Sequence, residues 1–309
     1  MALFDRRSKI GFIGAGTVGG SLAATLAGHD YPVAAVASRA FASACRMAAG
    51  VSGCTAHPEP QSVLEVCDLV FITTPDDAIQ SVVASSSWRA GQGVVHCAGS
   101  MSLDVLGSAV NQGAVPGALH PVQAFSSVEN GIESIPGATF GIEGGPEMRA
   151  YLKEMASAIG GNPVVLEAQD KPLYHVTGVM MGGMLSTLAA TAAQLWESFG
   201  FRRSDGIKAL APMMRQVAQN LEVSGVPGGV QGPYARGDIG TVRKHLETLQ
   251  SRAPHVLPLY CEMALAGLPF ALEKGTLSPE TADRIRELIA SANHCGVWTT
   301  GGKSYPSPG

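Results

Sequence analysis

Short apolar runs alternate with helical patterns from the start of the chain, as in IGFIGAGTVGGSLAATLAGHDYPVAAVASR between residues 10 and 39. Ile10, Phe12 and Ile13 predict a buried strand, and the Ala- and Leu-rich stretch from Ser21 to Ala27 predicts a helix. The run PVAAVA predicts a second strand. The segment therefore reads as a strand, a glycine turn, a helix and a strand.

The same alternation continues to about residue 168, and the apolar runs are those of buried parallel strands. It predicts a doubly wound, mainly parallel α/β sheet. The expected strands are 69–73, 93–97, 114–119, 138–142 and 163–166, and the expected helices are 78–88, 102–110 and 146–159.

From residue 169 the strand signals stop and helical periods dominate. We therefore expect two domains, a cofactor-binding domain over 1–168 and an all-helical domain over 169–309. The tail after Cys295 is expected to be loosely held. The expected helices are 173–199, 205–223, 241–249, 258–272 and 279–292, with a Gly- and Pro-rich loop at 226–237.

One segment, Val176 to Trp196, contains no charged residue and meets the length criterion for a membrane helix. Glycine, serine and threonine residues dilute it, and the small residues 178, 182, 186 and 190 give a smooth helix face. We therefore predict a helix buried between domains or subunits, in a homodimer, and no membrane span.

The composition excludes several classes of protein. Hydrophobic residues make up 46% and charged residues 15% of the chain, and the net charge is −4, which gives no general attraction to nucleic acid. The N-terminus MALFDRRSKIGF lacks the apolar core of a signal peptide. Six scattered cysteines without a C-x-x-C pair predict reduced thiols in a cytoplasmic protein and no metal site.

Gly14, Gly16 and Gly19 have the G-x-G-x-x-G spacing that binds a dinucleotide between a strand and a helix. The pyrophosphate would bind the free N–H groups at the helix start. The alternative is a purely structural glycine turn. The predicted cofactor-binding residues are Gly14, Ala15, Gly16, Thr17, Val18, Gly19, Ser38, Arg39, Thr74 and Pro75.

Ser38 and Arg39 stand at the end of the second strand, where an NAD site would place a carboxylate against the ribose. Arginine binds a phosphate with two parallel hydrogen bonds. These residues favour NADP(H) over NAD(H). Alternatively, Arg39 is only a solvated side chain.

Ligands of open α/β sheets bind at the carboxyl ends of the strands. His120, before Pro121, is predicted at such an end, where it could donate a proton or only bind a loop carbonyl. His96, within its strand, is expected to be structural. Tyr174 and His175 open the uncharged helix and are the second candidate pair, with Tyr174 as a substrate-binding residue and His175 as an alternative proton donor.

The segment GPYARGD contributes Arg236 and Asp238, followed by Thr241 and His245 on one predicted helix face. We expect Arg236 to bind an anionic or polar substrate and Asp238 to serve in catalysis. An internal ion pair between them that caps the helix is an equal alternative.

The chain resembles a known family in its glycine fingerprint and in five further segments, TTPDDAI, VVHCAGSMSLDVL, GALHPVQAF, YHVTGVMMGGML and GPYARGDIGTVRKHL. Over most of residues 9–260 the chain resembles Rossmann-like oxidoreductases of the 6-phosphogluconate-dehydrogenase-like superfamily that have a helical C-terminal domain of unassigned function. It is similar in plan to pyrroline-5-carboxylate reductases and ketopantoate reductases. The resemblance implies an N-terminal Rossmann domain that binds NAD(P), an all-helical second domain and a dimer.

The chain departs from that family where Gly182-Gly183 replaces a usual Ser-Asn pair and Gln231-Gly232-Pro233 replaces Thr-Gly-Pro. Our leading hypothesis is an NADPH-dependent oxidoreductase that reduces a C=O or C=N bond of a small, carboxylate-bearing substrate such as a 2-oxo acid or an imine. The alternative, motivated by the two glycines, is a sensor or regulatory protein that binds NADP(H) without turnover.

Overall fold

The computed structural model describes residues 3–293 of the 309-residue chain. The chain divides into two compact units, Met1–Met184 and Leu185–Gly309. The domain boundary expected at residue 168 lies before this division and remains a proposal. The tail expected to be loosely held lies outside the described residues.

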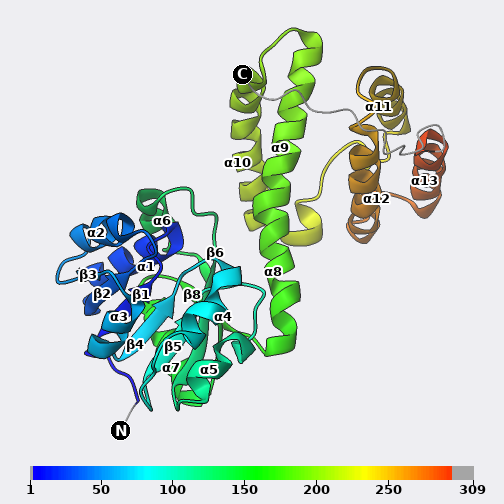
Figure 1. The fold of residues 1–309 in the computed structure, drawn as a ribbon. Helices are drawn as coiled ribbons and strands as arrows, with labels where there is room; N and C mark the ends of the chain where they lie inside the picture. The colour runs from blue at the N-terminus through cyan, green and yellow to red at the C-terminus, as the bar shows by residue number, and fades with distance from the viewer. Residues whose placement is uncertain (1–2, 294–309) are drawn as a thin grey trace. The chain divides into compact units, whose positions relative to one another are not determined.

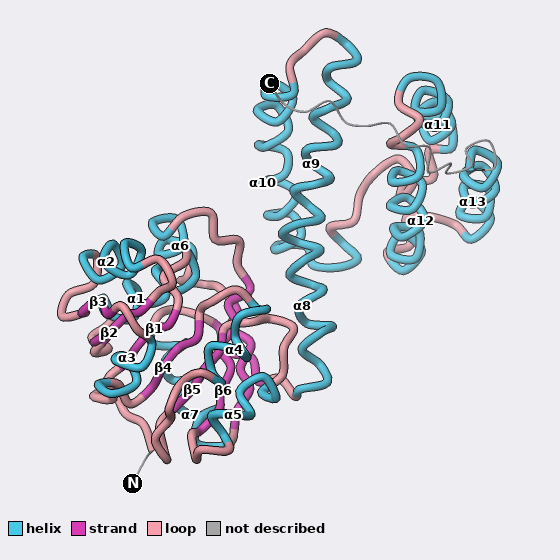
Figure 2. The backbone as a smooth tube through the Cα atoms, in the orientation of Figure 1, coloured by secondary structure: helices cyan, strands magenta, loops and turns pink. Residues whose placement is uncertain are grey.

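The described part of the first unit contains an eight-stranded sheet in the order β3-β2-β1-β4-β5-β6-β7-β8 (Figures 1 and 2). Its first six strands, in the order β3-β2-β1-β4-β5-β6, have the order of dinucleotide-binding sheets. The strands are β1 (Ile10–Ile13), β2 (Val33–Ala37), β3 (Thr55–His57), β4 (Leu69–Ile72), β5 (Gly93–His96), β6 (Val115–Val122), β7 (Thr139–Gly144) and β8 (Asn162–Val165).

Every strand pair of this sheet is parallel except one. β6 and β7 run antiparallel, with His120 opposite Gly141. β6 also extends beyond the predicted end of its strand, so that His120 and Pro121 lie inside it. The parallel pairing of β5 with β6 stops at His96 and Ala118. The mainly parallel α/β sheet is thus confirmed, and His120 lies just past the carboxyl end of its parallel part.

Apolar side chains on both faces explain why the central strands are buried. All residues of β1 and β4 are buried. Phe12 and Phe71 are paired in register and stack at 5.2 Å between ring centroids on one face. Ile13, Val70 and Ile72 belong to the apolar cluster on the other face.

Helices connect and cover these strands (Figure 1). Those at residues 41–49, 60–66 and 128–134 were not among the expected elements. The helices of the first unit are α1 (Thr17–Gly28), α2 (Phe41–Ala49), α3 (Pro60–Val66), α4 (Asp76–Ala84), η1 (Leu103–Leu106), α5 (Gly107–Val110), α6 (Val128–Ser134), α7 (Pro146–Ala158), η2 (Ala168–Asp170), α8 (Lys171–Val179) and η3 (Met180–Met184).

In the second unit, as far as it is described, all regular elements are helices, as Figure 2 shows. This confirms the helical C-terminal part. Its apolar core includes Val242, Cys261, Leu268 and Ile285. The elements are α9 (Leu185–Gln194), η4 (Leu195–Phe199), α10 (Arg203–Gly228), α11 (Ile239–Arg252), α12 (Leu257–Glu273) and α13 (Pro279–Asn293), and α10 is interrupted by non-helical Gly225 and Val226.

The uncharged segment forms one helical run, Ala168–Phe199, which includes a π-helical turn at Met180–Met184. By length and composition alone this run is apolar enough to cross a membrane. One such helix is only weak evidence for a membrane span. Only 11% of its most apolar window is buried inside the described chain. The burial expected between domains or subunits therefore stays a prediction.

Candidate functional site

The glycine turn lies between β1 and the N-terminus of α1, with Gly14, Ala15 and Gly16 in the turn. Gly14 has φ +111°, and a Cβ there would lie 2.6 Å from the backbone of Thr73. A Cβ at Gly19 would lie 2.5 Å from the Thr73 hydroxyl oxygen. These two glycines let β1, β4 and α1 pack closely, as the fingerprint requires.

Gly16 differs from the other two, because a Cβ there would meet no atom within 4 Å. It is the N-cap of α1 without a side-chain cap, and the first turn of the helix contains no acidic residue. The first N–H groups of α1 therefore have no side-chain cap at the positive end of the helix. This arrangement fits the pyrophosphate of a dinucleotide.

Two more predicted cofactor residues follow β2. Ser38 is half-buried and Arg39 is exposed, and Arg39 forms no ion pair among the described residues. Its guanidinium is thus available to a phosphate. Thr74 and Pro75 follow β4, and the Thr74 hydroxyl is buried without a hydrogen-bond partner in the described structure. β2, β1 and β4 are adjacent, so all predicted cofactor residues lie along one edge of the sheet.

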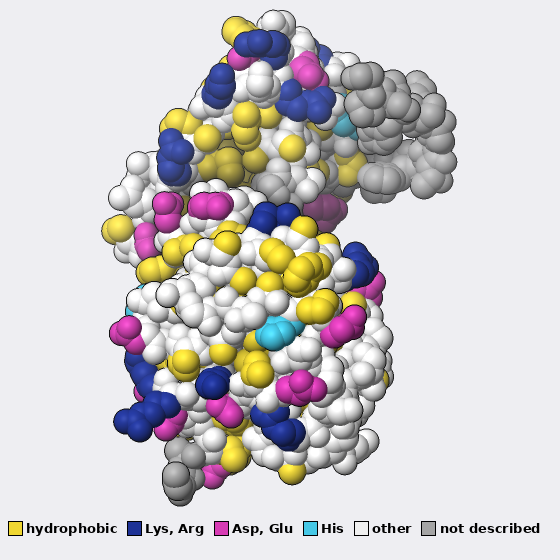
Figure 3. All heavy atoms as spheres, turned by 60° about the vertical axis from the view of Figure 1, so that its left-hand side comes forward, with side chains coloured by type: hydrophobic (Ala, Val, Ile, Leu, Met, Phe, Trp, Pro, Cys, Tyr) yellow, Lys and Arg dark blue, Asp and Glu magenta, His cyan; other side chains and the backbone are white. Residues whose placement is uncertain are grey.

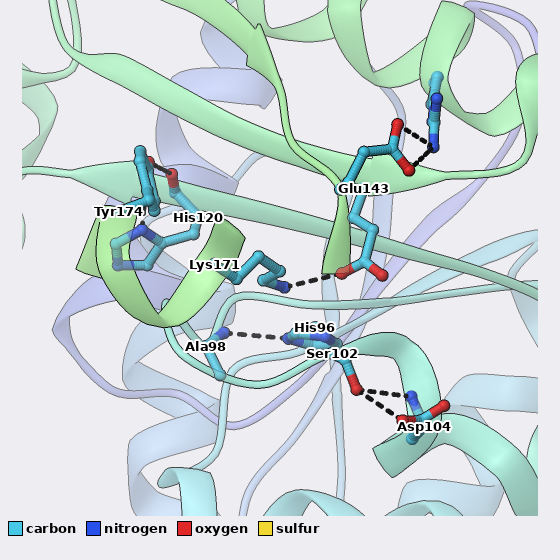
Figure 4. Close-up of polar contacts among 10 residues, drawn as sticks. His96, Ala98, Ser102, Asp104, His120, Glu143, Lys171 and Tyr174 are labelled. Carbon is cyan, nitrogen blue, oxygen red and sulfur yellow. Dashed lines mark hydrogen bonds and ion pairs between the residues drawn. The ribbon is translucent and has the colours of Figure 1, made fainter. Parts of the chain in front are cut away.

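An imidazole and phenol cluster lies at the same edge, beyond β5 (Figure 4). Nδ1 of His120 is 3.3 Å from the hydroxyl oxygen of Tyr174 on α8, and this hydroxyl donates to the His120 carbonyl oxygen at 3.1 Å. The rings of His120 and His175 lie edge to face, 5.8 Å apart. The structure thus brings together three of the predicted site residues, His120, Tyr174 and His175.

Two glycines make room for this cluster. A Cβ at Gly99, in the segment after β5, would lie 2.3 Å from Cδ2 of His175 and 2.7 Å from Nε2 of His120. A Cβ at Gly141 on β7 would lie 2.7 Å from the Tyr174 hydroxyl. Any larger residue at either position would displace a ring of the cluster.

A buried ion pair lies beside the cluster. Nζ of Lys171, at the start of α8, is 3.2 Å from Oε2 of Glu143 on β7, and the two side chains are 2% and 9% exposed. Burial lowers the pKa of Lys171, and the Glu143 carboxylate opposes that shift. Figure 4 shows the pair between His120 and His96. The sequence reading missed it, although one glutamate in the apolar strand TFGIEG was a usable signal.

Both strand histidines are neutral at neutral pH. Burial, then the nearby charges of His175 and Lys171, lowers the pKa of His120 to about 4. Burial and the Lys171 charge lower the pKa of His96 to about 3. His96 accepts the Ala98 N–H at Nδ1, at 3.2 Å, and its Nε2 is buried without a partner in the described structure.

The remaining candidates lie in the second unit. Asp238 caps α11 by accepting the Thr241 N–H at 2.9 Å and the Thr241 hydroxyl at 2.7 Å. These bonds lower the pKa of Asp238. Arg236 is exposed and forms no ion pair among the described residues, so the expected cap exists without the expected Arg236–Asp238 pair. His245 bonds the Tyr260 hydroxyl instead, at 3.0 Å from its Nδ1.

Gly182 and Gly183 lie in the π-helical turn η3 of the first unit. A Cβ at either position would meet no atom within 4 Å, so the backbone does not require glycine there for space. Isolated π-turns within helices are frequent at functional sites. No group of three or more metal-binding side chains occurs in the part of the chain that the structure describes.

Two family models match the chain. A Rossmann-like domain matches residues 2–121, and a domain of unknown function, DUF2520, matches residues 138–266. His96 and His120 lie in the first match, whereas Glu143, Lys171, Tyr174 and His175 lie in the second. The cluster is therefore built from both. No curated protein matches the sequence significantly.

Solved structures share the fold at low identity. A candidate NADP oxidoreductase from Bacteroides fragilis is 22% identical with a TM-score of 0.69, over 85% of this chain and 99% of that one. A reductive aminase from Aspergillus terreus, in complex with NADPH, is 17% identical with a TM-score of 0.57, over 94% and 95%.

A 1-pyrroline-5-carboxylate reductase from Streptococcus pyogenes is 14% identical with a TM-score of 0.56, over 94% of this chain and 100% of that chain. At these identities the likeness shows the fold alone. Residues 2–121 therefore match a Rossmann-like domain and residues 138–266 match DUF2520, and the chain shares its fold with these oxidoreductase structures.

Proposed function

We propose that the protein is an NADPH-dependent oxidoreductase that reduces a C=O or C=N bond of a small, carboxylate-bearing substrate. One observation carries the proposal. The uncapped, acid-free start of α1 and the cluster of His120, Tyr174 and His175 lie at the carboxyl ends of strands in one parallel sheet. A dinucleotide site and a set of proton-handling side chains thus share one edge.

The cofactor preference rests on the end of β2. Arg39 is an exposed cation without an ion pair in the described structure, and no carboxylate occupies the neighbouring position 38. This favours the 2′-phosphate of NADP(H) over the ribose hydroxyl of NAD(H). Proteins of this fold that are described as NADP oxidoreductases or as NADPH complexes support the same preference.

When bound, NADPH supplies the hydride. The chain's residues hold it through the N–H groups of α1, the Arg39 guanidinium and the Thr74 hydroxyl. His120, neutral at neutral pH, offers a hydrogen bond rather than an acidic proton. We therefore assign proton donation to His175, with Tyr174 as its neighbour on α8.

Arg236, in the second unit, is the residue we propose to bind a carboxylate. Arg236 is exposed and free of ion pairs in the described chain, and guanidinium groups bind carboxylates with two hydrogen bonds. Asp238 fixes the start of α11 next to it and so holds the loop in place. Its proposed contribution to catalysis is indirect.

A homodimer is part of the proposal. Apolar side chains stand exposed along α8 and η3, with Leu173 73% and Met181 63% exposed. Figure 3 shows hydrophobic side chains, in yellow, on the surface that it draws. A second copy would cover them. We therefore propose a homodimer in the cytoplasm and not a membrane helix. The side chains in question are Leu173, Val176, Val179, Met180, Met181 and Met184.

The proposal is tested by incubating pure protein with NADPH and a panel of 2-oxo acids and cyclic imines while following the absorbance of the reduced cofactor. Substrate-dependent oxidation of NADPH supports a reductase. Tight NADPH binding with no oxidation by any member of the panel would favour the alternative, a sensor that holds the cofactor without turnover.

A further inference from the structure

The Tyr174 hydroxyl contacts both the ring and the backbone of His120. A phenol has one O–H proton, and in the structure this proton is donated to the His120 carbonyl oxygen, at 3.1 Å. The hydroxyl oxygen can then only accept from Nδ1 of the same residue, at 3.3 Å. Nδ1 of the neutral ring is therefore the N–H nitrogen, and Nε2 carries the lone pair.

The Nε2 edge of the ring has a different environment. It faces the Gly99 backbone, where a Cβ would lie 2.7 Å from Nε2, and Nε2 makes no hydrogen bond among the described residues. The groups around the ring are His96 from β5 and Lys171, Tyr174 and His175 from α8. The carboxylate of Glu143 is paired with Lys171 and not with the His120 ring.

We propose that Tyr174 is a specificity-determining residue, which holds His120 with its Nε2 lone pair towards the substrate so that the site recognises an N–H donor. A protonated imine carries such a donor on the reacting nitrogen. A ketone oxygen carries only lone pairs and would meet the lone pair of Nε2. The inference rests on the proposed function. The orientation of His120 would select C=N over C=O substrates.

The proton assigned to His175 is used to form the protonated imine, and the hydride step that follows balances without a further proton. The carbon of the protonated imine takes the hydride with its electron pair, and the C=N π pair becomes the lone pair of the nitrogen. The cation becomes a neutral amine, and NADPH is oxidised to NADP⁺. A ketone would need a proton for its alkoxide, and its oxygen lone pairs would meet the lone pair of Nε2, so the discrimination rests on the contact with Nε2 and not on the proton supply.

The tautomer can be measured without cofactor or substrate. In protein labelled with ¹⁵N at histidine, long-range ¹H–¹⁵N correlation separates N–H from lone-pair nitrogens, and His120→Asn identifies the His120 signals. We expect Nδ1–H in the unmodified protein and a shift of the population towards Nε2–H in Tyr174→Phe. Tyr151→Phe, which removes a buried hydroxyl from the core away from the cluster, should change nothing. Nε2–H in the unmodified protein, or an unchanged tautomer in Tyr174→Phe, would overturn the assignment.

The specificity is measured as the ratio of kcat/KM for 1-pyrroline to that for cyclopentanone, with NADPH. We expect the imine to be preferred. Tyr174→Phe should lower the ratio by roughly 10-fold or more, which is the effect of losing one buried hydrogen bond. Preference for the ketone, or a ratio that Tyr174→Phe leaves unchanged, contradicts the specificity. NADPH binding without turnover of either compound rejects the proposed function and the substrate selection together, whereas the tautomer is decided by the spectra alone.

Discussion

The hydroxyl of Tyr174 lies 3.3 Å from Nδ1 of His120 and 3.1 Å from the carbonyl oxygen of the same residue. This double contact joins both the ring and the backbone of His120 on β6 to Tyr174 on α8. The orientation of His120 thus depends on a neighbour outside its own strand. Changes that move α8 or the segment after β5 should therefore affect the chemistry without touching His120.

Gly99→Ala should lower turnover by about 10²-fold, the loss typical of a small misplacement of reacting groups. The new methyl group would lie 2.3 Å from His175 and 2.7 Å from His120, so the rings must move apart. NADPH affinity, measured by calorimetry, should stay within a few-fold. The matched control is Gly107→Ala, whose Cβ would meet no atom within 4 Å. Full activity of Gly99→Ala would show that the ring arrangement is not needed.

Arg39→Asp should weaken NADPH binding far more than NADH binding. The change removes an exposed cation after β2 and places a carboxylate where the 2′-phosphate would lie. Dissociation constants for both cofactors, measured by titrating the intrinsic fluorescence, check this. Equal affinities for NADPH and NADH in the unmodified protein, left unchanged by the substitution, would remove the argument from Ser38 and Arg39.

The sequence predicts the cofactor-binding part of the sheet edge better than the cluster of His120, Tyr174 and His175. The glycine turn, α1 and the Arg39 position follow from local periodicity and a fixed spacing, which a single segment contains. The contact between His120 and Tyr174 joins residues 54 positions apart, and it depends on β6 running on past β5 to pair with β7. Nothing local gives the direction of β7, so the sequence predicts neither this contact nor the partner of Glu143, although a single glutamate in an apolar strand marks its position as unusual.

Because His96 and His120 are buried in the neutral form, we expect the folded protein to lose stability in acid. The pKa of His96 is about 3 in the folded chain against an ordinary 6.5, so below about pH 6.5 the unfolded state binds more protons. Stability should then fall as the pH drops, by up to about 1.4 kcal/mol per pH unit for this one group, until the folded pKa is reached.

Urea unfolding at about pH 7.5 and about pH 5 measures this slope. His96→Gln should reduce the difference between the two conditions, whatever its effect on stability at neutral pH. His255→Gln, at an exposed position of the second unit, should leave the difference as it is. An identical pH dependence in His96→Gln would refute the buried neutral histidine.

Covering the apolar face of α8 and η3 should require a second copy of the chain. Light scattering at micromolar concentration should give a mass of twice 31.8 kDa. Met181→Lys places a charge on a side chain that is 63% exposed and should shift the population towards the monomer. A clean monomer in the unmodified protein would reject the homodimer.

The transfer of a hydride from NADPH to substrate is the central claim, and an isotope measures it directly. NADPH carrying deuterium on the transferring carbon is incubated with a cyclic imine, and the product is analysed by mass spectrometry. The account predicts one deuterium per amine product, formed at a rate that His175→Ala, which removes the assigned proton donor, lowers by about 10²-fold to 10⁴-fold. NADPH that binds tightly but leaves every imine and 2-oxo acid of the panel free of deuterium would contradict it, and the protein would then be a binder of NADP(H) rather than a reductase.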